Sequence, residues 1–241
     1  MTNQVNFISE THEKDYNFNE VMGKLSHVKG SENYLKDIFL KSLRSTSGKL
    51  KYKRYACSPL RYAGGKSLAV GIIIELLPNV KKLVSPFFGG GSVEIACANK
   101  LGIKVIGYDI FSILVNYWQV QIKTPIVLSK YLEKFEPTKE GFKKIKEILK
   151  KHWKGIDLIK DDIALAAYYY FNHNTSYGPH FLGSPSSVYL QQERYDTLIN
   201  KVKNFSAPNL SVYCDSFENT IVKHHNNFLY CDPPLLFRWK K

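Results

Sequence analysis

The sequence of 241 residues contains only four cysteines, and their spacing forms no metal-binding pattern. No pair has C-x-x-C spacing, which argues against a structural zinc site. Cys97, Cys214 and Cys231 lie in apolar helix or strand patterns, so we expect buried free thiols at these positions. This use of cysteine favours a cytoplasmic protein.

Long apolar runs are also absent. None approaches the length of a membrane span, and the polar N-terminus has no signal-peptide pattern, so we expect no membrane partner. The hydrophobic content of 44% is nevertheless ample for a globular core. The length fits one large domain, or one domain with a smaller insertion.

Acidic residues are few relative to basic ones, with a formal net charge of +13 and a pI of about 9.4. This imbalance indicates a polyanionic partner, nucleic acid before membrane, although a uniformly lysine-rich proteome would also explain it. Residues 41–74 contain no acid at all, which suits either phosphate contacts or a solvated linker. The basic residues of this run are Lys41, Arg44, Lys49, Lys51, Lys53, Arg54, Arg61 and Lys66.

Residues 83–94 organise the rest of the chain. An apolar strand pattern leads into three consecutive glycines, and a helical pattern follows at once. Gly89 and Gly91 tolerate positive φ, and the free N–H groups at the start of the helix suit a bound ligand. A βα turn with spare glycines is the alternative interpretation of this loop taken alone.

Two strand ends carry acids that favour a ligand site. The apolar run 105–108 ends at Asp109, one helix after the glycine loop, where nucleotide-binding folds place a ribose-binding carboxylate. A helix N-cap is the alternative role for Asp109, and the two roles are compatible. Residues 227–234 form another apolar strand pattern that closes at Asp232 with two prolines, which stiffen the backbone beyond the strand.

Together these motifs resemble the N6-adenine DNA methyltransferases of the Dam-like type. Phe87, Gly89 and Gly91 match the family's F-x-G-x-G loop for S-adenosylmethionine. Residues 58–66 are similar to its P-[FL]-x-[WY]-x-G-G-K element, with Tyr62 and Lys66 on the aromatic and cationic positions. These elements occur in the family's order, which strengthens the resemblance beyond any single motif.

Asp232, Pro233 and Pro234 match the family's D-P-P-Y loop, with Leu235 in place of the tyrosine. The resemblance implies that a target adenine is flipped from duplex DNA and that the Asp232 carboxylate and the Pro233 carbonyl accept its amine hydrogens. Transfer of the methyl group would then be direct, without a metal. Because Leu235 cannot stack on the base, we expect a loss of about one to two decades in rate or binding.

The resemblance also implies the site residues and partners. The catalytic residues would be Asp232, Pro233 and Pro234. A cognate restriction enzyme is a candidate partner besides DNA, in a restriction-modification or phage-related role. The residues expected to bind S-adenosylmethionine are Tyr62, Lys66, Phe87, Gly89, Gly91, Asp109, Asp215 and Asp232. Phe217 is a weaker candidate near the donor's adenine.

The implied fold is α/β, a Rossmann-like S-adenosylmethionine-dependent methyltransferase fold with an inserted, mostly helical target-recognition region. We predict an N-terminal extension of unknown role at 1–50, a donor-binding part at 51–123, the insertion at 124–190 and the rest of the catalytic domain at 191–241. Strands are expected at 80–85, 104–108, 210–214 and 227–232. Family members continue past the D-P-P loop, so we expect the C-terminal strands of the sheet to be missing and the chain to be truncated after Pro234, leaving an exposed apolar edge.

Within the insertion, residues 142–153 form a helical apolar stripe opposite a basic face that suits either phosphate contacts or simple solvation. The basic face consists of Lys139, Lys143, Lys144, Lys146, Lys150, Lys151 and Lys154. An aromatic helix is expected at 164–171, followed by a loop at 172–187. Asn174, Ser176 and Tyr177 in this loop are candidates for DNA contacts.

Two alternative functions remain. The chain could be a non-catalytic DNA- or S-adenosylmethionine-binding remnant of the family. A Rossmann dehydrogenase would require G-x-G-x-x-G after the first strand, and Glu94 stands where the third glycine belongs. That alternative also leaves the Asp-Pro-Pro segment unexplained.

Overall fold

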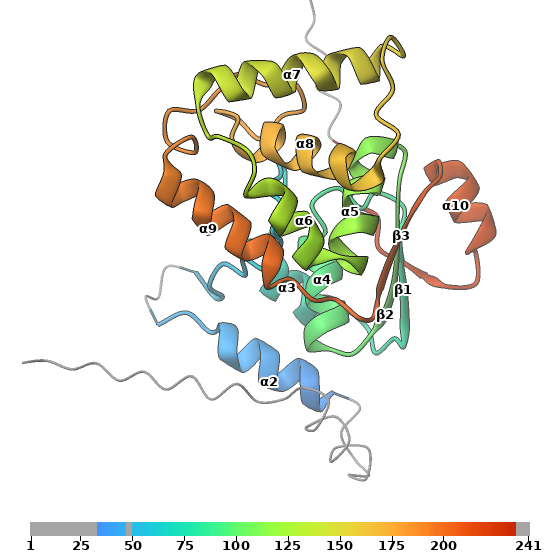
Figure 1. Cartoon of the computed structure of the whole chain (residues 1–241). Coiled ribbons are helices and arrows are strands. Elements are labelled where there is room, and N and C mark those ends of the chain that lie inside the picture. Colours follow the sequence, from blue (N-terminus) through green and yellow to red (C-terminus); the bar gives the residue numbers. More distant parts are fainter. Residues whose placement is uncertain (1–32, 47–49, 235–241) are drawn as a thin grey trace, which may run out of the picture.

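The computed structural model describes residues 33–46 and 50–234, which form an α/β fold around a parallel sheet (Figure 1). Within these residues the sheet contains β1 (Lys82–Ser85), β2 (Lys104–Asp109), β3 (Leu210–Cys214) and β4 (Phe228–Leu229). The first three strands predicted from the sequence are confirmed to within two residues at their ends. None of the helices in the described ranges is both long and apolar enough to span a bilayer.

Helices connect and cover these strands. Near the N-terminal side lie α2 (Tyr34–Leu43) and α3 (Val70–Leu76), and α4 (Ser92–Lys100) and α5 (Ser112–Lys123) follow β1 and β2. The region between β2 and β3 continues with α6 (Pro125–Leu132), α7 (Lys139–Trp153), α8 (Asp162–Asn174) and α9 (Gln192–Lys203). The helix α10 (Phe217–Lys223) joins β3 to β4.

The order of strands reverses at β1. The sheet order is β3-β2-β1-β4, so the chain runs outward from β1 to β3 and then returns to add β4 on the other side of β1. All neighbouring strands are parallel, and therefore the carboxyl ends of β1 and β4 meet at one edge. Open α/β sheets bind ligands at such a switch point. The glycine loop follows β1, and the Asp-Pro-Pro segment follows β4.

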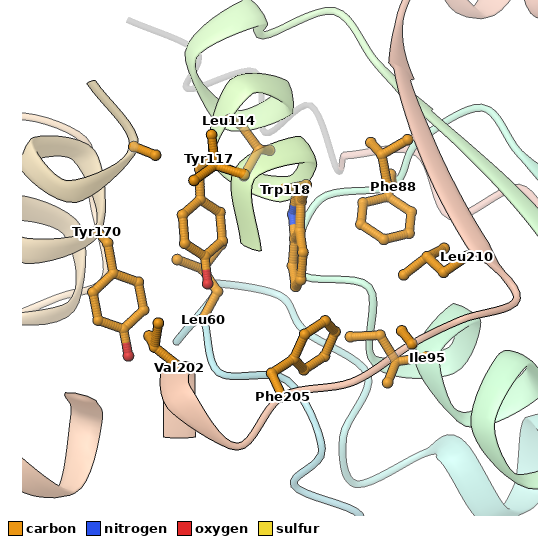
Figure 2. Packing of buried hydrophobic residues seen from close by; sticks show 14 of the residues in the cluster. Leu60, Phe88, Ile95, Leu114, Tyr117, Trp118, Tyr170, Val202, Phe205 and Leu210 are labelled. Atoms are coloured by element: carbon orange, nitrogen blue, oxygen red, sulfur yellow. The ribbon is translucent and has the colours of Figure 1, made fainter. Parts of the chain in front are cut away.

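The main core lies on one face of the sheet. The helices α4 and α5 cover this face, whereas α10 lies on the opposite side (Figure 1). Phe88, Trp118 and Leu210 pack together here with Ile95 from α4 (Figure 2). The rings of Phe88 and Trp118 meet edge to face at 5.2 Å. Burying each such side chain contributes about 1.5–3 kcal/mol, so this face supplies much of the stability.

The helical region between β2 and β3 extends the same core. Tyr117 of α5 stacks on Tyr170 of α8 with ring centroids 5.5 Å apart (Figure 2). The Tyr195 hydroxyl of α9 donates a hydrogen bond of 2.8 Å to the Leu132 carbonyl at the end of α6. The region 124–190, predicted as a mostly helical insertion, contains α6, α7 and α8 and packs against the sheet's own helix α5. Its assignment to target recognition stays a prediction.

The N-terminal boundary at residue 50 also stays a prediction. Phe39 and Leu43 of α2 are buried in the main core. The Lys36 ammonium donates a hydrogen bond of 2.6 Å to the Leu77 carbonyl beyond α3. The described part of the predicted extension is thus packed against the rest of the fold, and residues 1–32 lie outside the described residues.

Three predictions about local structure are wrong. Residues 172–174 are the last turn of α8 rather than a loop, and they are buried; one side-chain atom of each forms a hydrogen bond to Arg61 or Leu182. Cys214 and Cys231 are exposed, since both lie near the outer strands of the described sheet; only Cys97 of the three is buried. The strand expected at 227–232 is shorter, since β4 has only two residues; it is the half-buried outer strand of the described sheet on its side, in line with the expected edge.

Candidate active site

The glycine loop after β1 is held by hydrogen bonds to the neighbouring strand and helix. The Phe88 N–H donates to the Tyr108 carbonyl at 2.8 Å, and the Gly91 N–H donates to the Phe88 carbonyl at 2.9 Å. Gly91 has φ of 64° at the N-cap of α4, a conformation that favours glycine. The Trp118 indole N–H donates to the Gly89 carbonyl at 2.9 Å. The loop is therefore a fixed turn at the carboxyl end of the sheet.

Tyr62 lies directly against this loop. A Cβ atom added at Gly89 would lie 2.9 Å from the Tyr62 ring, and one at Gly90 would lie 2.5 Å from the Tyr62 Cβ. Glycine is required here because this aromatic ring occupies the space that a side chain would need. Burial, and secondarily the charge of Asp109, raises the pKa of Tyr62 to about 12, so the phenol stays neutral at physiological pH.

Asp109 connects the end of β2 to the loop and to α5. Its Oδ2 accepts a hydrogen bond of 3.0 Å from the Gly89 N–H. Its Oδ1 accepts one of 3.0 Å from the N–H of Phe111, the N-cap residue of α5. Asp109 thus accepts a hydrogen bond from the start of α5. It lies two residues before the N-cap, so the alternative interpretation, in which Asp109 is itself the N-cap, is wrong. Each carboxylate oxygen has a second lone pair that can accept a further bond.

Asp215 lies beside Asp109 at the end of β3. Its backbone N–H donates to the Asp109 carbonyl at 3.2 Å. Its Oδ1 accepts hydrogen bonds of 2.9 Å from the Asn219 amide and from the Ser216 N–H, and these bonds lower the pKa of Asp215. Two of the three predicted donor-binding carboxylates, Asp109 and Asp215, therefore occupy adjacent strand ends.

Phe217 reaches the glycine loop despite the serine that separates it from Asp215 in the sequence. Its ring stacks on Phe87 with centroids 5.2 Å apart and planes 29° apart. The Phe217 side chain is 42% exposed, so the pair forms an open aromatic surface beside the loop.

The Asp-Pro-Pro segment also reaches the loop's side of the sheet. The Tyr230 N–H donates to the Val84 carbonyl at 2.8 Å, which ties the segment to β1 just before Asp232. The Lys66 ammonium forms an ion pair of 2.6 Å with Asp232 Oδ2. Lys66, which the resemblance places among the donor-binding residues, has Asp232 as its partner in this structure. Pro233 and Pro234 are exposed beyond this pair, whereas Leu235 lies outside the described residues.

Comparison with known proteins identifies the family of this arrangement. The family model for D12 class N6 adenine-specific DNA methyltransferases matches residues 62–237, which include the glycine loop, Asp109, Asp215 and the Asp-Pro-Pro segment. The chain belongs to this family.

Three curated relatives are similar to the chain. Type II methyltransferase M.FokI of Planomicrobium okeanokoites is 30% identical over 78% of the chain and 30% of the relative. Modification methylase StsI of Streptococcus sanguinis is 28% identical over 76% of the chain and 29% of the relative. Type II methyltransferase M.MjaIII of Methanocaldococcus jannaschii is 29% identical over 73% of the chain and 68% of the relative. The chain therefore spans less than a third of the length of the first two relatives.

Sequence reasoning missed a buried carboxyl group behind the glycine loop. Glu94 in the first turn of α4 is 3% exposed, and its Oε1 accepts a hydrogen bond of 2.7 Å from the Ser85 hydroxyl. Burial, with a smaller contribution from the charge of Asp232, raises the pKa of Glu94 to about 7. The sequence pattern offered one signal, an acid on the apolar side of a short helix.

A second missed feature joins Arg61 to the end of α8. The Arg61 N–H donates to Asn174 Oδ1 at 2.8 Å, and the guanidinium donates to the Asn174 carbonyl at 2.6 Å. Asn174 and Ser176 are fully buried with internal partners, which removes them as candidates for direct DNA contacts in this structure. Tyr177 is 83% exposed and stays a candidate.

Proposed function

We propose that this chain carries the donor-binding and adenine-binding site of a DNA methyltransferase that transfers a methyl group from S-adenosylmethionine to N6 of adenine. The observation that carries the proposal is the meeting of two motifs at the β1/β4 switch point. The segment before the glycine loop contributes Lys66, whose ion pair with Asp232 joins the motif for the donor to the motif for the target base. The activity of a longer protein containing this chain is part of the same proposal.

The residues around the glycine loop fit the donor. The loop offers backbone groups at the start of α4, the open pair of Phe87 and Phe217 suits stacking on an adenine ring, and Asp109 and Asp215 retain acceptor capacity for hydroxyl or amine groups. When bound, the donor would supply an electrophilic methyl group on its sulfonium. The donor-binding residues of the proposal are Tyr62, Lys66, Phe87, Gly89, Gly91, Asp109, Asp215 and Asp232.

Asp232, Pro233 and Pro234 are proposed to hold the target adenine. Lys66 occupies Oδ2 of Asp232, and the carboxylate retains lone pairs that can accept an amine hydrogen. The Pro233 carbonyl would accept the other hydrogen, and the proline ring of Pro234 would restrict the backbone. Accepting both hydrogens increases the electron density on N6, so most of the acceleration would come from positioning and electrostatics.

The position of α7 and its exposed lysines favour duplex DNA as the partner. Its buried side, with Phe142 and Leu149, packs inward, while the opposite side lies at the outer surface of the molecule above α8 (Figure 1). The C-terminal end of α7 lies near the site, because the Trp153 ring contacts Phe111 at 5.5 Å, two residues after Asp109. Phosphate contacts along this helix would place a duplex beside the strand ends. The exposed lysines, here called the α7 lysine face, are Lys139, Lys143, Lys144, Lys151 and Lys154.

The names of the relatives, two type II methyltransferases and a modification methylase, support a restriction-modification role. A restriction enzyme that cleaves the same DNA sequence would then be the functional partner of this chain.

The proposal is tested by incubating the purified chain with methyl-labelled S-adenosylmethionine and adenine-unmethylated DNA, followed by assay of N6-methyladenine. The variant Asp232→Asn is the control for background incorporation. Calorimetric titration with S-adenosylmethionine measures donor binding separately. Donor binding without incorporation would overturn the proposed catalysis and support the non-catalytic alternative, and absence of both from folded protein would overturn the donor site.

A further inference from the structure

The last turn of α8 forms hydrogen bonds to the backbone of Arg61, the residue that precedes Tyr62. The Arg61 N–H is held by Asn174 Oδ1 at 2.8 Å, and the Arg61 carbonyl is held by His173 Nε2 at 2.8 Å. Both hydrogen-bonding groups of one backbone residue are thus fixed by consecutive side chains of a helix more than a hundred residues away in the sequence. The backbone of Arg61 has little freedom to move while α8 keeps its place in the core.

The same histidine also contacts Tyr62. The rings of His173 and Tyr62 stack with centroids 5.9 Å apart and planes 20° apart, and Tyr169 packs on His173 at 5.2 Å. Tyr62 in turn fills the space above Gly89 and Gly90. The chain of contacts therefore runs from the core helix α8 through His173 to Tyr62 and the glycine loop.

We propose that His173 is a positioning residue of the methyl-donor site, which fixes the Arg61 backbone and the Tyr62 ring against the glycine loop. This inference rests on the proposed function, since it assumes that Tyr62 and the loop bind S-adenosylmethionine. His173 acts through Tyr62 and has no assigned contact with the reacting atoms.

The protonation state of His173 suits this role. A carbonyl oxygen only accepts hydrogen bonds, so Nε2 carries the proton in the bond to Arg61. His173 is 4% exposed, and burial lowers the pKa of its imidazole to about 4, which keeps the ring neutral at physiological pH. A neutral ring donates from Nε2 without adding a charge beside the Arg61 guanidinium. The other nitrogen, Nδ1, is buried and has no hydrogen-bond partner among the described residues.

Amide variants separate the hydrogen bond from simple packing. A glutamine amide reaches about as far as His Nε2, whereas an asparagine amide corresponds to Nδ1 and falls short of the Arg61 carbonyl. In the full chain, His173→Asn should weaken S-adenosylmethionine binding about five- to tenfold, the cost of removing one hydrogen bond together with some ring packing. His173→Gln should stay within about threefold of the parent protein, because its amide restores the donor.

The experiment titrates S-adenosylmethionine into each variant by calorimetry and measures thermal unfolding, DNA affinity and steady-state methylation. The exposed His180 supplies the matched control His180→Asn, which should bind the donor like the parent protein. We expect His173→Asn to raise the donor KM while the turnover number at saturating donor and the DNA affinity change less than about threefold.

The outcomes distinguish this inference from the proposed function. If the parent protein binds no S-adenosylmethionine, the donor site itself is wrong. If the parent binds it and folded His173→Asn binds equally well, the positioning role is overturned while the donor site stands. If His173→Asn and His173→Gln both weaken the donor equally, the Nε2 bond to Arg61 is not the cause and the inference is also overturned.

Discussion

Replacing Glu94 by glutamine should stabilise the protein at alkaline pH and leave its stability nearly unchanged at acidic pH. Burial raises the pKa of Glu94 from 4.5 to about 7, so the folded protein resists ionisation of a group that ionises freely when unfolded. At 1.36 kcal/mol for each pKa unit, ionised Glu94 destabilises the fold by about 3 kcal/mol above pH 7. Below pH 4.5 the group is protonated in both states, and this difference disappears.

Glutamine has nearly the same shape as a protonated glutamic acid and can accept the hydrogen bond from the Ser85 hydroxyl, which donates at 2.7 Å in the parent protein. Glu94→Gln should therefore remove the penalty without creating a cavity. For a chain of this size, about 3 kcal/mol corresponds to a rise in Tm of roughly 6–12 °C at pH 8.5.

The measurement is urea unfolding of the parent and Glu94→Gln at pH 4 and pH 8.5, with the exposed Glu136→Gln as the matched control. Other titrating groups are common to all the proteins, so their effects cancel in the difference between parent and variant. The control should stay within about 0.5 kcal/mol of the parent at both pH values. A Glu94→Gln protein that is less stable than the parent at pH 8.5, or whose advantage does not grow with pH, would refute the reasoning.

Three further predictions concern the site. Asp232→Asn should lower methyl incorporation about a hundredfold or more, well beyond the amount by which it raises the dissociation constant for S-adenosylmethionine, because Asp232 is proposed to contact both the donor and the target base; a loss of incorporation no larger than the loss of donor binding would contradict a role at the target base. Phe217→Ala should raise the donor dissociation constant about three- to tenfold through loss of the aromatic surface with Phe87, and unchanged calorimetric affinity would remove this pair from the site. Changing three lysines of the α7 lysine face to glutamine should reduce the slope of log K against log salt by about 0.9 for each DNA phosphate that the variant no longer neutralises, as measured by fluorescence anisotropy of labelled duplex DNA. An unchanged slope relative to the parent would show that this face does not bind DNA. The matched control changes three exposed lysines before or at the amino ends of the strands, Lys81, Lys100 and Lys104.

The sheet could be predicted largely because its signals are local. The strands β1, β2 and β3 are short apolar runs bounded by turn residues; β2 ends at Asp109, and Asp215 directly follows β3. The parallel order of the sheet then brings Asp109 and Asp215 to one edge, as the resemblance implied. The stacking of Phe217 on Phe87 could not be predicted from the sequence, because the start of α10 decides where that ring points.

Other features depend on long-range packing that no local pattern encodes. The bond from Arg61 to Asn174 joins residues 113 positions apart, and the polar stretch at 172–174 is typical of a surface loop when considered alone. In the structure Arg61 and Leu182 donate hydrogen bonds of 2.8 Å to Asn174 Oδ1 and Asn172 Oδ1 of this buried stretch, while the side-chain nitrogens of both asparagines have no hydrogen-bond partner among the described residues. The burial of Glu94 could likewise not be predicted, since an acid in the first turn of a helix usually faces solvent.

The helical region has two structural connections that follow from this packing. The helix α8 is fixed to the sheet's own helix α5 through Tyr170 and Tyr117, and its last turn holds Arg61 beside the glycine loop. The loop after α8 is tied back by the Tyr177 N–H, which donates to the Ser184 carbonyl at 2.8 Å, and by the Lys146 ammonium of α7, which donates to the Gly183 carbonyl at 2.9 Å. The helix α8 thus connects α7, which carries the lysine face, to Arg61 and Tyr62 at the proposed donor site. Because this connection runs through packed side chains and direct hydrogen bonds, α8 fixes the position of Tyr62 through His173.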